Sequence, residues 1–320
     1  MRRVIVTLAT NARSLERLAA LLAPQDFDAW QWVAPPGADF SIDALPAPVR
    51  ERTTVVTAGP GGLYAACTDP DAVYLKLDEA IAWLCPDFCR LMWEYRAWHH
   101  RPFLTHGNCV GSPGLAFVHD RLGVVPTIPE GRPASTDPED HVAASEAFAA
   151  ASHESLLAAL AAGDTSPWAF DTWALHGRET VPLVATCWFG RDFEPFRGSV
   201  GSDDRAFLCR DRPAQLDGLS GSVCGRALCA LAFPARYEDA YPLPSPAAPL
   251  PAASTPQPWP APPAAAAPEP AHSEPATPEA AVVAEVPVPK APRKRRAAAP
   301  SPEPRPKRAP RPKASVVDVA

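Results

Sequence analysis

The sequence predicts an α/β domain, with a mostly parallel sheet and helices on both of its faces, followed by a disordered Pro/Ala-rich tail. Through the first 110 residues, short apolar, β-branched segments alternate with segments whose apolar residues recur at helical spacing. Such alternation is typical of a parallel sheet covered by helices. The composition then changes, because residues 1–240 hold 19 of the 42 prolines and the last 80 residues hold the other 23.

Strand-like segments and helix signals alternate in the first part of the chain. The predicted strands are residues 3–7, 30–33, 53–57, 72–77 and 103–106. One helix begins at Asn11 or Ser14 and places four leucines on a single face, and a second helix is predicted at residues 87–99. Residues 59–62, Gly-Pro-Gly-Gly, predict a turn, because they match neither of the common phosphate-binding glycine patterns.

The second part of the chain is less regular. Residues 123–140 are rich in proline and polar side chains and predict a long loop. An Ala/Leu-rich helix is expected at residues 143–162 and a short helix from residue 201. The aromatic residues within 187–193 are expected in the core. The last folded segment is expected to run from Ser222 to about Tyr241.

The domain boundary is predicted at residue 240, and residues 241–320 form the tail. Apart from Trp259 the tail has almost no large side chains, and its Pro/Ala runs provide no core and block helices. It carries ten basic and six acidic residues, a net charge of +4, whereas residues 1–240 carry 20 basic and 30 acidic residues, a net charge of −10. The sequence thus predicts an acidic folded domain and a separate basic tail.

All ten basic residues of the tail lie within residues 290–313, which predicts a binding segment for nucleic acid or another polyanion. No aromatic residue lies among them to stack on bases, so a solvated tail without a dedicated partner is the alternative. The predicted polyanion-binding residues are Lys290, Arg293, Lys294, Arg295, Arg296, Arg305, Lys307, Arg308, Arg311 and Lys313.

We expect a cytoplasmic protein without a targeting segment. No run approaches the roughly 20 apolar residues that a membrane span needs. The eight cysteines are spaced neither as a disulfide framework nor as a zinc site. They are predicted to be small, buried thiols in a reducing compartment.

The most informative motif is residues 73–83, Val-Tyr-Leu-Lys-Leu-Asp-Glu-Ala-Ile-Ala-Trp. It places Asp78 and Glu79 directly after a buried strand, where open α/β sheets bind their ligands. Carboxylates at such a position hold a divalent cation against nucleotide phosphates, so both residues are predicted to bind a nucleotide. The alternative is that they are acids at the start of a helix, favoured by its dipole. A metal site would need a third acid, and Ala80 stands in its place.

Several motifs in the same order resemble a little-characterised microbial family whose members are similar to nucleotide-sugar-dependent glycosyltransferases of the GT-A type. The family's first motif reads Leu-Asp-Asp-Asp-Ile-Val-Trp and its second reads Trp-Phe-Gly-x-Asp-Phe. The resemblance covers about residues 1–240. It rests on residues 74–83, 187–193, 203–204 and 223–229.

The resemblance implies transfer of a sugar from a nucleotide-sugar to an unidentified acceptor. It implies that Asp78 faces the ribose or a metal-bound water, and that Mn²⁺ or Mg²⁺ neutralises the leaving diphosphate. Asp203 and Asp204 would be catalytic residues that deprotonate or position the acceptor hydroxyl. The alternative for this pair is helix capping, with Ser202 as the cap.

The same resemblance predicts a weak or absent metal site. Ala80 replaces the family's third acid, and Leu231 stands where the family has a His. A metal held by Asp78 and waters alone would bind weakly, because affinity depends on the number and charge of the ligands. Two other functions therefore stay open: a degenerate family member that binds nucleotide or sugar without catalysis, and a nucleic-acid-associated protein anchored by its tail.

Overall fold

The computed structural model describes residues 1–59, 62–175, 181–215, 221–237 and 239–243. These residues belong to the first of two units into which the chain divides, Met1–Pro256. The ten basic residues predicted to bind a polyanion lie outside the described residues. Both that binding segment and the domain boundary at residue 240 stay predictions.

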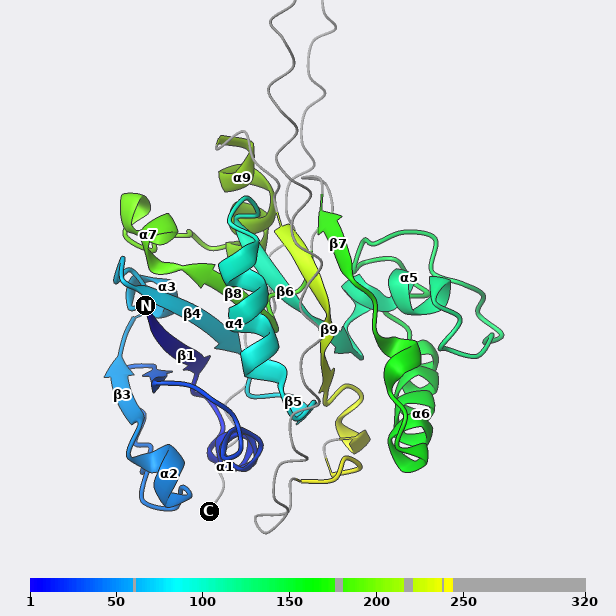
Figure 1. The fold of residues 1–320 in the computed structure, drawn as a ribbon, viewed down its shortest axis with the longest axis horizontal. Helices are drawn as coiled ribbons and strands as arrows, with labels where there is room; N and C mark the ends of the chain where they lie inside the picture. Colours follow the sequence, from blue (N-terminus) through cyan, green and yellow to red (C-terminus); the bar gives the residue numbers. More distant parts are fainter. Residues whose placement is uncertain (60–61, 176–180, 216–220, 238, 244–320) are drawn as a thin grey trace, which may run out of the picture. The chain divides into compact units, whose positions relative to one another are not determined.

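Among the described residues, nine strands form one mixed sheet (Figure 1). They are β1 (Arg2–Leu8), β2 (Ala29–Ala34), β3 (Thr53–Thr57), β4 (Ala72–Leu77), β5 (Ile81–Leu84), β6 (Leu104–Val110), β7 (Thr172–Leu175), β8 (Ala185–Phe189) and β9 (Gly221–Leu231). The strand order is β3-β2-β1-β4-β8-β6-β9-β5, and β7 pairs with β9. β1, β2, β3, β4, β6 and β9 share one direction, which confirms a mostly parallel sheet, while β5, β7 and β8 run the opposite way.

The helices of the described residues are α1 (Ala12–Leu22), α2 (Ala47–Arg50), α3 (Gly62–Ala65), α4 (Phe88–Trp98), α5 (Pro113–Arg121), α6 (Glu146–Ala162), α7 (Gly190–Phe193), α8 (Asp204–Ala206) and α9 (Arg212–Gln215). Short 3-10 turns are η1 (Ser166–Trp168), η2 (Glu194–Phe196) and η4 (Ala235–Tyr237), and η3 (Phe207–Asp211) is π-helical. Asn11 caps α1, as predicted, because its side chain accepts hydrogen bonds from the backbone N–H groups of Arg13 and Ser14.

Helices cover both faces of the sheet. On one face, Trp188 of β8 packs against Tyr64 of α3 and Phe193 of α7. On the opposite face, α4 lies so close to β6 that a Cβ atom at Gly107 would be 2.9 Å from the ring of Phe88. Successive strand residues point to opposite faces, so these two contacts define the two layers of helices.

Three strands differ from the sequence predictions. Asp78 and Glu79 are followed by β5, so the alternative that they begin a helix is wrong. Ile81–Leu84 is buried on both sides and pairs with β9, and this tertiary pairing overrides the weak local signal of four residues. β7 and β8 were not predicted either, although the aromatic residues of β8 are buried as expected.

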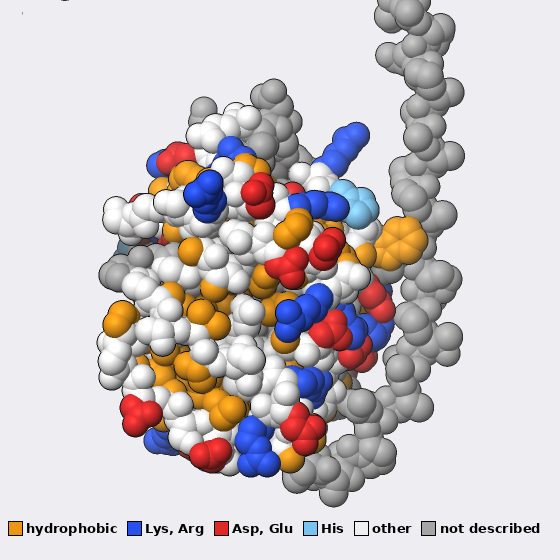
Figure 2. Space-filling view, turned by 90° about the vertical axis from the view of Figure 1, so that its left-hand side faces the viewer, with side chains coloured by type: hydrophobic (Ala, Val, Ile, Leu, Met, Phe, Trp, Pro, Cys, Tyr) orange, Lys and Arg blue, Asp and Glu red, His pale blue; other side chains and the backbone are white. Residues whose placement is uncertain are grey.

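The edge strand β3 belongs to the side of the molecule seen in Figure 2. Hydrophobic side chains gather in the middle and toward the left of this face, with charged side chains above, below and to the right of them. Val55 of β3 is 43 % exposed, and Leu8 at the end of β1 is 47 % exposed. Apolar surface is therefore accessible around the first strands of the sheet.

The end of the described chain returns to the sheet. The ring of Tyr241 stacks on that of Trp83, with 6.4 Å between centroids, and its hydroxyl lies 2.6 Å from Nδ1 of His153. Arg17 donates a hydrogen bond to the backbone carbonyl of Tyr241. Tyr241 is thus part of the packed structure.

The prediction that the cysteines are thiols, mostly buried, is confirmed. All eight cysteines are free thiols, and only Cys85 among them is not fully buried. No helix among the described residues has the length and hydrophobicity to cross a lipid bilayer.

Candidate functional site: a cavity at the switch point of the sheet

A cavity of about 1110 Å³ lies beside the carboxyl ends of β1, β2, β3 and β4. The chain passes from β1 outward to β2 and β3 and then returns to β4 on the other side of β1. The strand order therefore reverses between β1 and β4, and open α/β sheets bind ligands at such a switch point. The described residues that line the cavity are Leu8, Thr10, Pro35, Pro36, Ala58, Gly59, Gly62, Leu63, Tyr64, Lys76, Asp78, Glu79, Ser199, Val200, Gly201, Ser202 and Asp204.

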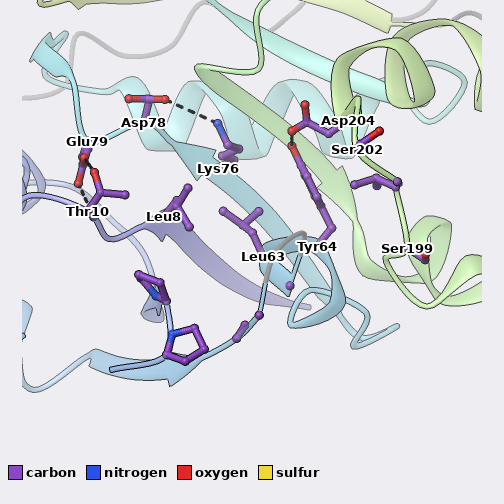
Figure 3. Close-up of a pocket in the computed structure, with 17 residues that line it drawn as sticks. Leu8, Thr10, Leu63, Tyr64, Lys76, Asp78, Glu79, Ser199, Ser202 and Asp204 are labelled. Carbon is purple, nitrogen blue, oxygen red and sulfur yellow. Dashed lines mark hydrogen bonds and ion pairs between the residues drawn. The ribbon is translucent and has the colours of Figure 1, made fainter. Parts of the chain in front are cut away.

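The cavity has an apolar part and a charged part. Its apolar side chains come from the ends of β1, β2 and β3, from α3 and from Val200. Its charged groups gather near the end of β4 and at α8. Figure 3 shows Asp78, Lys76 and Asp204 along one side, with Leu8 and Leu63 below them.

Asp78 lies directly after β4 with its carboxylate accessible, since 40 % of the side chain is exposed. Its backbone N–H donates to the carbonyl of Val184 at 2.8 Å, and its Oδ1 accepts a hydrogen bond from the backbone N–H of Ala80 at 3.0 Å. These two bonds fix the direction of the carboxylate. Its other oxygen, Oδ2, faces the Lys76 ammonium at 3.9 Å.

Glu79 lies in the cavity wall, but its carboxylate is occupied. Oε2 accepts hydrogen bonds from the backbone N–H groups of Thr10 at 2.9 Å and Asn11 at 3.0 Å, and Oε1 accepts one from the Thr10 hydroxyl. A carboxylate at the start of α1 is favoured by the helix dipole. Glu79 thus joins the end of β4 to the loop between β1 and α1.

Lys76 is a cavity residue that the sequence analysis missed. It lies two residues before Asp78, and residues two apart on a strand share one face, so the alternation rule could have identified it. Its ammonium donates a hydrogen bond to the carbonyl of Leu183. Burial lowers the pKa of Lys76, and the negative charges of Asp78 and Asp204 oppose that shift.

The two acids before α8 have different surroundings. Asp203 is the N-cap of α8, because its Oδ1 accepts a hydrogen bond from the backbone N–H of Ala206 at 2.8 Å; Ser202 is not the cap. Asp204 lines the cavity, and its Oδ2 accepts a hydrogen bond from the Tyr64 hydroxyl at 2.8 Å. Burial, followed by the charge of Asp204, raises the pKa of Tyr64, so its hydroxyl keeps the proton that it donates.

The wall opposite β4 is formed by the loop after η2. It begins with Arg197 and Gly198 in the left-handed region, at φ 52° and 66°. A Cβ atom at Gly198 would lie 2.2 Å from the carbonyl group of Tyr64. Only glycine therefore allows this loop to lie directly on α3.

The residues around Asp78 do not fit the Mn²⁺ or Mg²⁺ ion that the family resemblance implies. Glu79 is bound to Thr10, and the third position is Ala80. Lys76 would repel a divalent ion on Asp78 by something on the order of 5 kcal/mol at an effective dielectric constant of about 20. Within the part of the chain that the structure describes, no three His, Cys, Asp or Glu side chains are close enough to hold a metal ion together.

The two positions at which the resemblance implies further metal ligands, Ala80 and Leu231, lie on paired segments, one residue out of register. Ile81 lies opposite Leu231 in the pairing of β5 with β9. The backbone N–H of Ala232 also donates to the carbonyl of Ala80 at 2.7 Å. Neither Ala80 nor Leu231 is among the described residues that line the cavity.

Three buried histidines, His106, His119 and His153, lie outside the cavity lining. Nε2 of His119 lies 2.7 Å from Oδ1 of Asn108, and burial lowers the pKa of His119 to about 3. His153 contacts Tyr241 and the carbonyl of Phe233, each at 2.6 Å. These contacts join α5 to β6, and α6 to the segment that follows β9.

No family model matches this chain, and no curated protein matches it. Among solved structures, the crystal structure of HddC from Yersinia pseudotuberculosis is similar over 33 % of this chain, with 18 % sequence identity and a TM-score of 0.26. The matched region spans 58 % of the HddC chain.

Proposed function

We propose that this protein binds a nucleotide-sugar in the cavity at the ends of β1 to β4 and transfers the sugar to an acceptor hydroxyl. The observation that carries this proposal is the division of the cavity into an apolar and a charged part at the switch point of the sheet. A nucleotide has the same division, with an apolar base face and an anionic diphosphate. Its base would lie over the ends of β1, β2 and β3, and its diphosphate would lie near the end of β4.

The size of the cavity supports a ligand larger than a simple metabolite. Small-molecule sites usually enclose roughly 300–1,000 Å³. A volume of about 1110 Å³ accommodates a nucleoside diphosphate together with a sugar. This is consistent with the GT-A type of transferase that the sequence motifs resemble.

The proposal assigns the role of general base to Asp204. The hydrogen bond from Tyr64 holds Oδ2 of Asp204 and leaves Oδ1 for an acceptor hydroxyl. In the transfer, the acceptor oxygen forms a bond to the anomeric carbon of the sugar while the bond from that carbon to the diphosphate breaks. Asp204 takes the proton of the acceptor, and the diphosphate leaves with the bonding electron pair.

Binding without catalysis is a second candidate, and one observation favours it. The acid next to Asp78 is used to hold the β1–α1 loop and not a ligand. Because Glu79 stabilises the fold, a protein that no longer catalyses sugar transfer can still keep the nucleotide-binding site.

Binding is tested by thermal unfolding of the full chain with uridine, guanosine, cytidine, adenosine and thymidine diphosphates and their sugar conjugates. A ligand at 100 times its Kd adds about 2.7 kcal/mol of stability. We expect one base series to raise the Tm by about 5 to 10 °C. If every nucleotide and nucleotide-sugar leaves the Tm unchanged, the proposal is wrong.

Catalysis is tested by the release of nucleoside diphosphate from the ligand found in that screen. Asp204→Asn should bind the nucleotide-sugar with a Kd within threefold of wild type but release diphosphate at least about 100-fold more slowly. Asp203→Asn is the matched control, because asparagine also caps helices and should retain turnover. Binding without diphosphate release, even with simple sugars added as acceptors, would favour the second candidate.

A further inference from the structure

Lys76 is the one basic side chain among the described residues that line the cavity. Its side chain is 13 % exposed, compared with 40 % for Asp78, so the ammonium lies deeper than the carboxylate. In Figure 3 it lies between Asp78 and Asp204. Leu183 uses one of the three N–H donors of the ammonium, and the 3.9 Å separation from Asp78 is too long for a direct hydrogen bond.

The lysine and arginine content of the chain also distinguishes Lys76. Residues 1–240 contain 19 arginines but only one lysine, Lys76. Its strand, β4, is interior to the sheet, with β1 on one side and β8 on the other. An ammonium is a compact charge with three donors, whereas a guanidinium is a wide planar group. A compact cation therefore suits a largely buried side chain on an interior strand of the sheet.

A divalent ion and the Lys76 ammonium would compete for the same carboxylate. Metal ions near nucleotides are held by several oxygen ligands, and Asp78 is the one carboxylate at the end of β4 that is not engaged by the backbone of another segment. Oδ2 of Asp78, the oxygen that Ala80 leaves free, faces Lys76. The positive charge that a diphosphate requires is thus already present in the chain.

We propose that Lys76 takes the place of a divalent cation, binding the diphosphate of the nucleotide directly so that the site works without metal. This inference rests on the proposed function for the identity of the ligand. The N–H donors of Lys76 bind phosphate oxygens, as lysine does in other phosphate sites. When the bond to the sugar breaks, the same ammonium stabilises the negative charge that the diphosphate gains.

The test is isothermal titration calorimetry of the full chain with a nucleoside diphosphate, the corresponding nucleoside and inorganic pyrophosphate, in EDTA and with Mn²⁺. We expect the diphosphate and pyrophosphate to bind in EDTA, with Kd values within threefold of those in Mn²⁺. Lys76→Met should weaken both at least 30-fold and leave the nucleoside within threefold. Arg90→Met is the matched control, because it removes one positive charge from α4 on the opposite face of the sheet.

Two further measurements test the role of Lys76 if Lys76→Met folds poorly. Lys76→Arg retains the charge and should bind pyrophosphate better than Lys76→Met. In the wild-type protein, the ¹⁵Nζ NMR signal of Lys76 should shift when pyrophosphate is added and should not change when the nucleoside is added.

The outcomes separate this inference from the proposed function. Nucleotide binding that requires Mn²⁺ and is unaffected by Lys76→Met would overturn the inference and leave the proposed function standing. Lys76-dependent binding of pyrophosphate in EDTA, with no binding of any nucleotide-sugar, would support the inference and overturn the proposed function. If neither ligand binds, both are wrong.

Discussion

At the end of β4, two neighbouring acids have different roles because their surroundings differ. Asp78 presents an accessible carboxylate to the cavity, whereas the carboxylate of Glu79 is held by the backbone of Thr10 and Asn11. The sequence assigned both residues to nucleotide binding. It could not separate them, because the partners of Glu79 lie about 70 residues earlier in the chain.

The first prediction compares these two residues. Asp78→Asn should weaken nucleotide binding at least tenfold, because the resemblance implies that this carboxylate accepts hydrogen bonds from the ribose. It should change the free energy of unfolding by less than about 1 kcal/mol, since asparagine can still accept the hydrogen bond from Ala80. Glu79→Gln should instead lower the unfolding free energy by about 1–3 kcal/mol, because two backbone N–H donors share a weaker acceptor. Urea denaturation and nucleotide titration measure both effects. A loss of stability in Asp78→Asn together with a loss of nucleotide binding in Glu79→Gln would refute this interpretation.

The second prediction concerns the pH dependence of stability. Burial lowers the pKa of Lys76 in the folded protein, with Asp78 and Asp204 opposing, whereas in the unfolded chain this lysine titrates near its ordinary value of 10.5. Between these two pKa values the unfolded chain binds more protons, so the contribution of Lys76 makes the unfolding free energy rise with pH. Lys76→Met should remove this rise. Urea denaturation of both proteins from pH 7 to pH 10.5 tests it, and parallel curves would contradict it.

The secondary structure elements differ in how far they could be predicted. α1, α4 and β1 to β4 have clear apolar patterns, α1 also has a capping residue, Asn11, and the structure places these elements where expected. β5 has only four residues, and β7 and β8 owe their positions to pairing with β9 and with β4 and β6. The cavity residues differ in the same way. Asp78 could be predicted because it follows a buried strand. That Asp204, more than 120 residues later, lines the same cavity depends on tertiary packing and could not be predicted.

The third prediction concerns the pairing of β5 with β9. Ile81 lies opposite Leu231 and Ala80 is bonded to Ala232, so side chains at positions 80 and 231 point to opposite faces of the strand pair. Ala80→Asp combined with Leu231→His should therefore change the affinity for Mn²⁺ by no more than the sum of the single changes. Calorimetry with Mn²⁺ on the single and double variants measures the coupling. A combined effect larger than the sum would show that the two side chains reach one ion.

At the scale of the whole molecule, the described fold extends at least to Tyr241. Its buried ring contacts Trp83 and its hydroxyl contacts His153, which lie in different elements. The domain boundary predicted at residue 240 would remove this tyrosine, while the proline-rich composition begins just beyond it. The acidic net charge of residues 1–240 and the basic segment at 290–313 still predict a salt-dependent interaction of the tail with a polyanion.

The fourth prediction compares two truncations. A chain ending after residue 243 should unfold cooperatively with a Tm close to that of the full chain, because the residues removed have almost no core-forming side chains. A chain ending after residue 240 should lose about 2–3 kcal/mol, from the buried ring of Tyr241 and its hydrogen bond. Calorimetric unfolding measures both proteins. Equal stability of the two truncations would show that Tyr241 contributes nothing.

The contact between Glu79 and the β1–α1 loop has a consequence for ligand selection. This contact fixes the apolar part and the charged part of the cavity to each other, and the close approach of Gly198 to Tyr64 fixes another part of its wall. A preorganised site loses little conformational entropy on binding, and it cannot reshape itself around a ligand of different size. We therefore expect discrimination between purine and pyrimidine nucleotides to come from shape, as differences in dissociation rate rather than in association rate.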